Sequence, residues 1–280
     1  MTTENCVRKN RLYRAPENNQ DEAMPQFERY VGIDYSGAKT STDSLPGLRV
    51  YAADWVMSPR EVLPPPSPRK YWTRRGLAEW LVAQLSGGKP MLVGIDHGFS
   101  FPMRYFEKHR LALDWWKFLA DFQKHWPTDG DHTSVDFVRD GEGAKRRGDS
   151  SWLRLTEQWT ARAKSVFQFD MQGQVATSTH AGLPWLRFIR GRCRNRVHFW
   201  PFDGWQIPAG RSVLAEVYPS LWMRRFAAED RDGDQHAAFS VAAWLRRVDA
   251  DGSLTGYFNP PLEPQERTQA RVEGWILGVI

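Results

Sequence analysis

Two short apolar runs of this chain end in the same three residues, Gly-Ile-Asp, and small residues typical of a turn follow each of them. The first run, 30–33, ends at Asp34, and the second, 91–95, ends at Asp96. Apolar runs of four to eight residues that stop at Gly or Ser are typical of buried strands. Each aspartate is therefore expected where the chain leaves a central sheet, which predicts an α/β protein.

If these two strands are neighbours, Asp34 and Asp96 share the crevice at their carboxyl ends, where open α/β sheets bind ligands. Carboxylates at that separation repel each other, and a hard divalent cation with oxygen ligands relieves the repulsion. The pair therefore favours a metal-dependent phosphoryl-transfer site. For either aspartate alone, ordinary turn chemistry is the alternative, because Asp before a turn also bonds to nearby backbone amides.

Apolar spacing predicts the other elements of the chain. A strand over 48–56 is expected to pair with the first in an antiparallel hairpin, and a helix over 74–85 to cross over to the strand ending at Asp96. The later predictions are a helical insertion with a loop inside it at about 100–165, strands at 196–200 and 212–218, and helices at 219–228 and 235–247. Asp234 is predicted to cap the last helix.

The 280 residues contain no charged or low-complexity linker, which favours a single domain over 28–280. Residues 1–27 show no apolar periodicity and are expected to form a mobile arm. No signal peptide and no stretch of eighteen apolar residues is found, so we expect no membrane contact. The two cysteines, Cys6 and Cys193, are too few for a disulfide framework, which favours a cytoplasmic protein.

A formal net charge of +5 and a run of arginines favour an anionic partner. Arg187 and Arg190 belong to this run, which continues to Arg196, and it either lines a phosphate-binding face or forms a solvated helix end. Fourteen tryptophans could include stacking surfaces for unpaired bases, although most tryptophans belong to protein cores.

A second polar stretch lies inside otherwise apolar sequence. It contains Arg154, Glu157, Lys164, Asp170 and His180 near a glycine-containing turn. Because unpaired charges are costly to bury, such density predicts either a lined pocket or a buried ion-pair network that holds the insertion to the sheet. Both interpretations stay open at this point.

The order of these elements, with four short stretches, resembles a family of predicted nucleases, domain of unknown function 429. The matching stretches are 32–38, 93–96, 215–219 and 273–278. This resemblance implies a ribonuclease H-like fold, a mixed sheet flanked by helices. It also implies that Asp34 is the first-strand metal ligand, Asp96 the fourth-strand acid, and Glu216 the acid before a Tyr-Pro turn.

The chain departs from the family pattern at the late helix. Where the family resembles His followed by Asp-Ala, this chain reads Asp234-Gln235-His236-Ala237, with Ala237 at the acid position. Asp234 and His236 are the candidate substitutes for the missing acid.

These observations together predict a nuclease that hydrolyses phosphodiester bonds in DNA or RNA with Mg²⁺ or Mn²⁺. The expected catalytic and metal-binding acids are Asp34, Asp96, Glu216 and Asp234. The expected substrate-binding residues are Lys164, His180, Arg187, Arg190 and His236. One alternative is a catalytically degenerate nucleic-acid-binding module, and another is an actin-like ATP-dependent phosphotransferase whose phosphates lie in the turn at 32–37.

Overall fold

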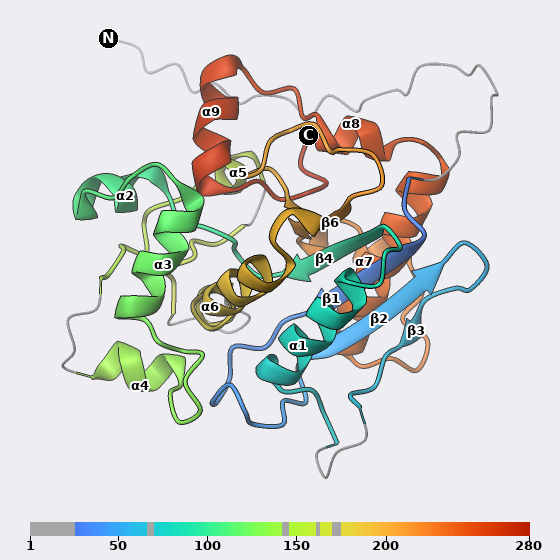
Figure 1. Cartoon of the computed structure of the whole chain (residues 1–280), viewed down its shortest axis with the longest axis horizontal. Coiled ribbons are helices and arrows are strands. Elements are labelled where there is room, and N and C mark those ends of the chain that lie inside the picture. Colours follow the sequence, from blue (N-terminus) through green and yellow to red (C-terminus); the bar gives the residue numbers. More distant parts are fainter. Residues whose placement is uncertain (1–25, 66–69, 142–145, 161–162, 170–174) are drawn as a thin grey trace.

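The computed structural model of the chain describes residues 26–65, 70–141, 146–160, 163–169 and 175–280. In this part of the chain six strands form one mixed sheet with helices on both faces (Figure 1). The strands are β1 (Arg29–Asp34), β2 (Arg49–Asp54), β3 (Arg60–Glu61), β4 (Met91–Asp96), β5 (Val197–Phe199) and β6 (Ser212–Glu216). The prediction of an α/β protein with a mixed sheet flanked by helices is confirmed.

The strand order is β3-β2-β1-β4-β6-β5. β2 is antiparallel to β1 and to β3, whereas β4 is parallel to β1, and β6 is parallel to β4 and β5. The predicted hairpin is therefore present, and the strand ending at Asp96 returns beside the first strand. The helix that crosses between them, α1 (Arg74–Leu85), begins after Thr73, whose side chain accepts a hydrogen bond from the Gly76 amide.

The remaining helices of the described ranges cover the sheet and its carboxyl edge. They are α2 (Met103–His109), α3 (Trp115–His125), α4 (Val135–Asp140), α5 (Leu155–Trp159), α6 (Val175–Cys193), α7 (Gly233–Ala250), α8 (Leu254–Phe258) and α9 (Pro264–Glu273). α7 packs against β1 and β2 on one face, and α1 and α6 pack together on the other (Figure 1). The predicted insertion carries α2 to α5.

Two predictions differ from the observed elements, and β3, α6, α8 and α9 were not predicted. The segment 219–228 forms two short 3-10 turns, Pro219–Leu221 and Met223–Arg225, in place of a helix. The cap of α7 is Asp232, whose side chain accepts from the Gln235 amide, and Asp234 lies in the first turn. α6 was not among the predicted helices because it is buried on most sides and contains Gly182 and Pro184, which lower helix propensity and blur the apolar periodicity.

The two Gly-Ile-Asp motifs place their glycines directly under α7. A Cβ on Gly32 would lie 2.6 Å from the Ala242 amide nitrogen and closer still to the Ala238 carbonyl oxygen. A Cβ on Gly94 would lie 2.8 Å from the side chain of Val241. Only glycine therefore lets the backbone of α7 lie on the strands at this distance.

The chain is anchored to the domain just after the first 25 residues, which lie outside the described ranges. Phe27 is buried, and its amide donates to the carboxylate of Asp249, which also accepts from the hydroxyl of Tyr30. Phe27, which was predicted to belong to a mobile arm over 1–27, is therefore part of the core. Residues 1–25 of the predicted arm lie outside the described ranges. No helix in the described ranges combines the length and the apolar character needed to cross a membrane.

Replacing Gly32 with Ala is expected to lower the free energy of unfolding by about 1–3 kcal/mol, because the new methyl group overlaps backbone atoms of α7. Urea unfolding followed by circular dichroism measures the change. Gly256→Ala in α8 is the matched control, since a Cβ there meets nothing within 4 Å, and it should be neutral or stabilising by up to about 1 kcal/mol. Equal stability of Gly32→Ala and wild type would contradict this packing.

Candidate functional site

The register of the sheet sets two carboxyl groups side by side. Asp34 of β1 is aligned with Asp96 of β4, and neighbouring strands lie about 4.8 Å apart. Aligned residues of parallel strands point to the same face, and side chains alternate along a strand. Because Gly32 and Gly94 face α7, the two aspartates two residues later face the same side. The register therefore brings the two aspartates to neighbouring strand ends on one face of the sheet, and a shared crevice stays a prediction.

α7 brings a third carboxyl group to the pair. Ala238 packs over Gly32, and Asp234 precedes it by four residues, or about 6 Å along a helix axis. Two residues along β1, from Gly32 to Asp34, span about 6.6 Å. Because α7 runs antiparallel to β1 and these two lengths are similar, Asp234 lies beside Asp34. Their carboxyl groups share a hydrogen bond. Asp232 caps the helix, which leaves Asp234 available for this contact.

Burial and neighbouring acidic groups raise the pKa values of all three aspartates. Burial, followed by the charges of Asp96, Asp234 and Asp232, raises the pKa of Asp34 well above its usual range. Burial, followed by the charge of Glu216, raises the pKa of Asp96 to about 7. Burial also raises the pKa of Asp234. Crowded acids with raised pKa values are typical of functional sites, because an added positive charge relieves their repulsion.

A buried arginine shapes the loop that follows Asp34. The guanidinium of Arg74 is fully buried and donates to the backbone carbonyls of Ser36, Ala38 and Lys39 at 3.1, 2.6 and 3.0 Å. On the other side, a Cβ on Gly37 would lie 2.6 Å from the Ser178 amide nitrogen, so α6 packs directly on this loop. The loop beside the acids is thus held from two sides.

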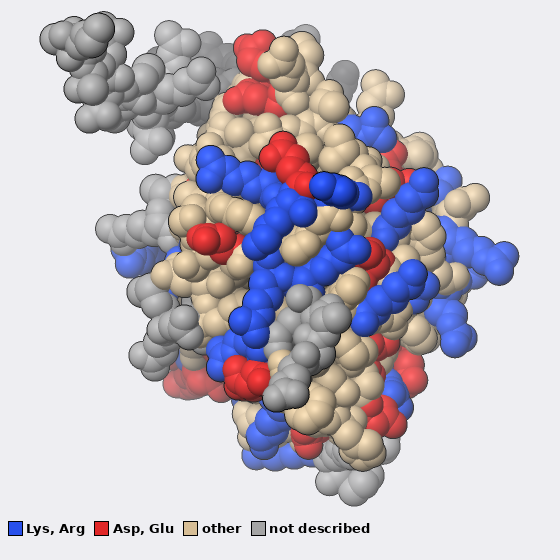
Figure 2. Space-filling view, turned by 90° about the vertical axis from the view of Figure 1, so that its left-hand side faces the viewer, with Lys and Arg blue, Asp and Glu red and all other residues tan. Residues whose placement is uncertain are grey.

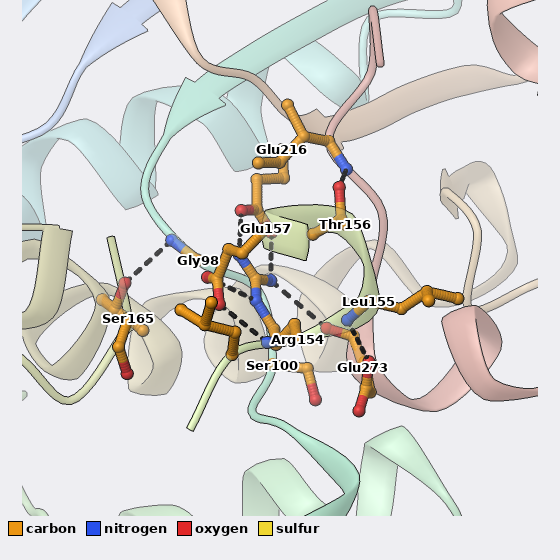
Figure 3. Close-up of polar contacts among 12 residues, drawn as sticks. Gly98, Ser100, Arg154, Leu155, Thr156, Glu157, Ser165, Glu216 and Glu273 are labelled. Carbon is orange, nitrogen blue, oxygen red and sulfur yellow. Dashed lines mark hydrogen bonds and ion pairs between the residues drawn. The ribbon is translucent and has the colours of Figure 1, made fainter. Parts of the chain in front are cut away.

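The charge of Glu216, the remaining predicted acid, is balanced by a buried arginine. Glu216 is aligned with Ile95, so its side chain leaves the sheet on the face opposite to Asp34 and Asp96. There Arg154 binds it with two parallel hydrogen bonds, of 2.5 Å to Oε1 and 2.8 Å to Oε2 (Figure 3). The Phe99 amide also donates to it, at 2.9 Å. Bidentate pairing with arginine uses the lone pairs that a metal ion would need.

The ion pair of Glu216 belongs to a larger buried network (Figure 3). Arg154 also binds Glu157 at 3.0 Å, and it donates to the backbone carbonyl of Glu273 at 3.2 Å. The carboxylate of Glu273 accepts from the amides of Met103 and Leu155, which begin α2 and α5. The network therefore ties β6 and α9 to the insertion, as one of the two interpretations of this polar stretch predicts.

The same polar stretch also lines a pocket, as the other interpretation predicts. The pocket has a volume of about 130 Å³ and lies where β4 and β6 end. Its walls include Asp96, Arg154, Glu157, Lys164 and Glu216. Lys164 is therefore the predicted substrate-binding residue that lies beside the acids. Asp170 falls outside the described residues.

The other predicted substrate-binding residues have partners within the fold. Arg187 donates to Gln123, and Arg190 pairs with Asp203 at 2.7 Å while its guanidinium lies over Trp115. The ring of His236 is buried and contacts the Met223 carbonyl at 3.1 Å.

His180 is likewise buried, and its Nδ1 donates to the Ala176 carbonyl at 2.9 Å. Its ring packs among aromatic side chains that include Phe101, Phe169 and Trp126. The structure thus gives His180 a packing role.

The acids match a hard divalent cation in kind, since Mg²⁺ and Mn²⁺ take oxygen ligands. Asp34, Asp96 and Asp234 would supply such ligands from two strands and one helix. Within the described ranges, no group of three His, Cys, Asp or Glu side chains is drawn together closely enough to hold an ion as it stands.

Two contributors to the site were missed by sequence analysis. Arg74 reads as an ordinary residue of a helix first turn, and its role depends on a loop 35 to 38 residues away. Tyr218 was recognised only as part of a turn, but it lines the pocket. The glycines of the Gly-Ile-Asp motifs were a usable signal, because glycine inside a strand indicates a close backbone approach.

Comparisons with protein-family models, with curated proteins and with solved structures found no match to this chain. The resemblance to domain of unknown function 429 therefore stays a prediction.

Arg154→Met is expected to lower the free energy of unfolding by about 3–5 kcal/mol, because it leaves two carboxylates buried without a counter-charge. Adding Glu216→Gln to this variant should recover part of the loss. Arg75→Met is the control, since Arg75 pairs with Asp131 at the surface, and its cost should stay below about 1 kcal/mol. Equal losses in urea unfolding for Arg154→Met and Arg75→Met would contradict the central role of Arg154.

Burial lowers the pKa of His180 from 6.5 to about 3, so the unfolded chain binds a proton that the folded protein excludes. This contribution to stability is complete above about pH 6.5 and is lost as the pH falls, by about 1.4 kcal/mol per pH unit. His180→Phe keeps the aromatic packing and removes the titration. Unfolding free energies measured between pH 6 and pH 4 should fall more steeply for wild type than for this variant. Parallel pH curves would contradict the prediction.

Proposed function

We propose that this protein is a divalent-metal-dependent nuclease that hydrolyses phosphodiester bonds in nucleic acid. The observation that carries the proposal is the register of Asp34 with Asp96, with Asp234 hydrogen-bonded to the first of them. Three acids from separate elements, each with a raised pKa, form an arrangement that a divalent cation would stabilise.

The topology supports a ribonuclease H-like fold for the domain. β1, β2 and β3 form an antiparallel meander, and β4 and β6 continue the sheet in parallel with β1. This is the arrangement that the resemblance to domain of unknown function 429 implies. In it, acids at the ends of the first and fourth strands and an acid from a late helix meet at one edge, as Asp34, Asp96 and Asp234 do.

Each of these residues has a distinct part in the proposed reaction. Asp34 and Asp96 would hold Mg²⁺ or Mn²⁺ from the sheet, and Asp234 would complete the set from α7. The bound ion would activate water and neutralise the phosphate charge. Arg74 fixes the loop after Asp34, so the substrate would meet a preformed edge. Glu216 is assigned to positioning, because Arg154 binds both its oxygens and its charge raises the pKa of Asp96.

The surface charge supports nucleic acid as the partner. Lys and Arg side chains form a nearly continuous band on the side of α2, α3 and α4 (Figure 2). The exposed basic residues of α2, α3 and the segment beside them are Arg104, Lys108, Arg110, Lys117, Lys124 and Arg147. Arg192, Arg194 and Arg196 at the end of α6 are also exposed, and none of them forms an ion pair with a described residue. Such bands attract phosphate backbones and release their counterions.

Cleavage of labelled DNA and RNA in Mg²⁺ or Mn²⁺ tests the proposal. Asp34→Asn and Asp96→Asn should lower the rate at least about 100-fold, and Asp234→Asn at least about tenfold, which is about 1.4 kcal/mol of barrier. Glu79→Gln, an exposed acid of α1, is the control and should cleave like wild type.

Metal binding gives an independent measurement. Mn²⁺ should raise the melting temperature of wild type and of Glu79→Gln but not that of Asp34→Asn, because ligands that bind only the folded state stabilise it. Wild type that binds nucleic acid but never cleaves it with any divalent metal would contradict the proposal and favour the degenerate binding module.

A further inference from the structure

The pocket at the ends of β4 and β6 adjoins the proposed catalytic acids. Asp96 belongs both to the acidic group and to the pocket wall. The group of Asp34 and Asp234 therefore lies on one side of Asp96 and the pocket on the other. A substrate phosphate at the acids would bring its neighbouring nucleoside to the mouth of this pocket.

The pocket walls divide into a charged part and an apolar part. Arg154 is held by Glu157 and Glu216, so this part of the wall is rigid and carries one positive and two negative groups. Lys164 adds an ammonium group at the wall. The other part of the wall is apolar and aromatic, and it consists of the side chains of Val175, Val217, Tyr218 and Ile276. A ligand with a flat apolar ring attached to an anionic group matches this division, and a nucleotide has that form.

The size of the pocket limits what it can hold. Its volume of about 130 Å³ is close to the roughly 150 Å³ that accommodates one benzene ring. Pockets for drug-sized molecules have roughly 300–1,000 Å³. One six-membered ring therefore fits, whereas a base pair does not. A base inside a duplex can reach such a pocket only after it leaves the stack.

We propose that this pocket binds one unpaired base next to the phosphate at the acids, so that the substrate of the site is single-stranded nucleic acid. The proposal rests on the proposed function for the position of that phosphate. Tyr218, which is half-buried at the wall, supplies a ring for stacking, and Lys164 supplies charge for a phosphate. Ala163 lines the pocket with a small side chain, so a larger residue there fills the space.

Fluorescence anisotropy in EDTA tests the pocket without any cleavage. The probes are a fluorescein-labelled 12-nucleotide oligothymidylate, the same oligothymidylate paired with oligodeoxyadenylate, and an abasic backbone of equal length. Wild type should bind the single strand at least tenfold more tightly than the duplex or the abasic probe. Equal binding of the single strand and the abasic probe would overturn the proposal, because the phosphates alone would then account for affinity.

Two variants locate the effect in the pocket. Ala163→Phe should weaken oligothymidylate binding at least tenfold and leave abasic binding unchanged, and Tyr218→Leu should weaken it at least fivefold. Ala209→Phe, at an exposed turn, is the matched control and should bind all three probes like wild type. Circular dichroism and melting temperature establish that each variant is folded. If both folded pocket variants bind oligothymidylate like wild type, the pocket does not hold the base.

Cleavage assays separate this proposal from the proposed function. Single-strand binding that depends on Ala163 and Tyr218, with no cleavage in any divalent metal, would keep the pocket and overturn the nuclease. Cleavage of single strands and duplexes at equal rates, unchanged by Ala163→Phe, would keep the nuclease and overturn the pocket.

Discussion

The contact between α7 and the two central strands determines the geometry of the candidate site. Gly32 allows the backbone of α7 to lie on the sheet, and a larger residue there would move it away, whereas Gly94 makes room for the side chains of Val241 and Val217. One helical turn then matches two strand residues in length, which brings Asp234 to Asp34. The close packing therefore also holds the acids together, because a shift of α7 would move Asp234 away from Asp34.

A second constraint comes from the charges buried at the carboxyl edge of the sheet. Arg154 pairs with both Glu216 and Glu157, and Glu273 fixes the first amides of α2 and α5. Breaking such a pair leaves a charge without solvent or partner, which is costly. The network therefore fastens the insertion to the sheet and also forms one wall of the pocket, so the stability of the domain and the shape of the site depend on the same contacts.

The acids of this edge differ in how their charge is balanced. Glu216 has an arginine partner, whereas Asp34, Asp96 and Asp234 lie near one another and each has a raised pKa. The alternation of side chains along a strand accounts for the division, since Glu216 points away from the face that carries Asp34 and Asp96. The acids on the α7 face are the proposed metal ligands, and the acid on the other face supports the fold.

The sequence by itself determined every strand except β3, the crossover helix α1 and the position of Asp34 and Asp96 at neighbouring strand ends, because apolar periodicity and turn residues are local signals. Only the tertiary structure decided which acid pairs with an arginine, since Arg154 and Glu216 are 62 residues apart. It also decided that Asp232 caps α7, that His180 packs in the core, and that α6 is a helix. These outcomes depend on contacts between distant segments, and a side chain's partner and burial are properties of the packed molecule.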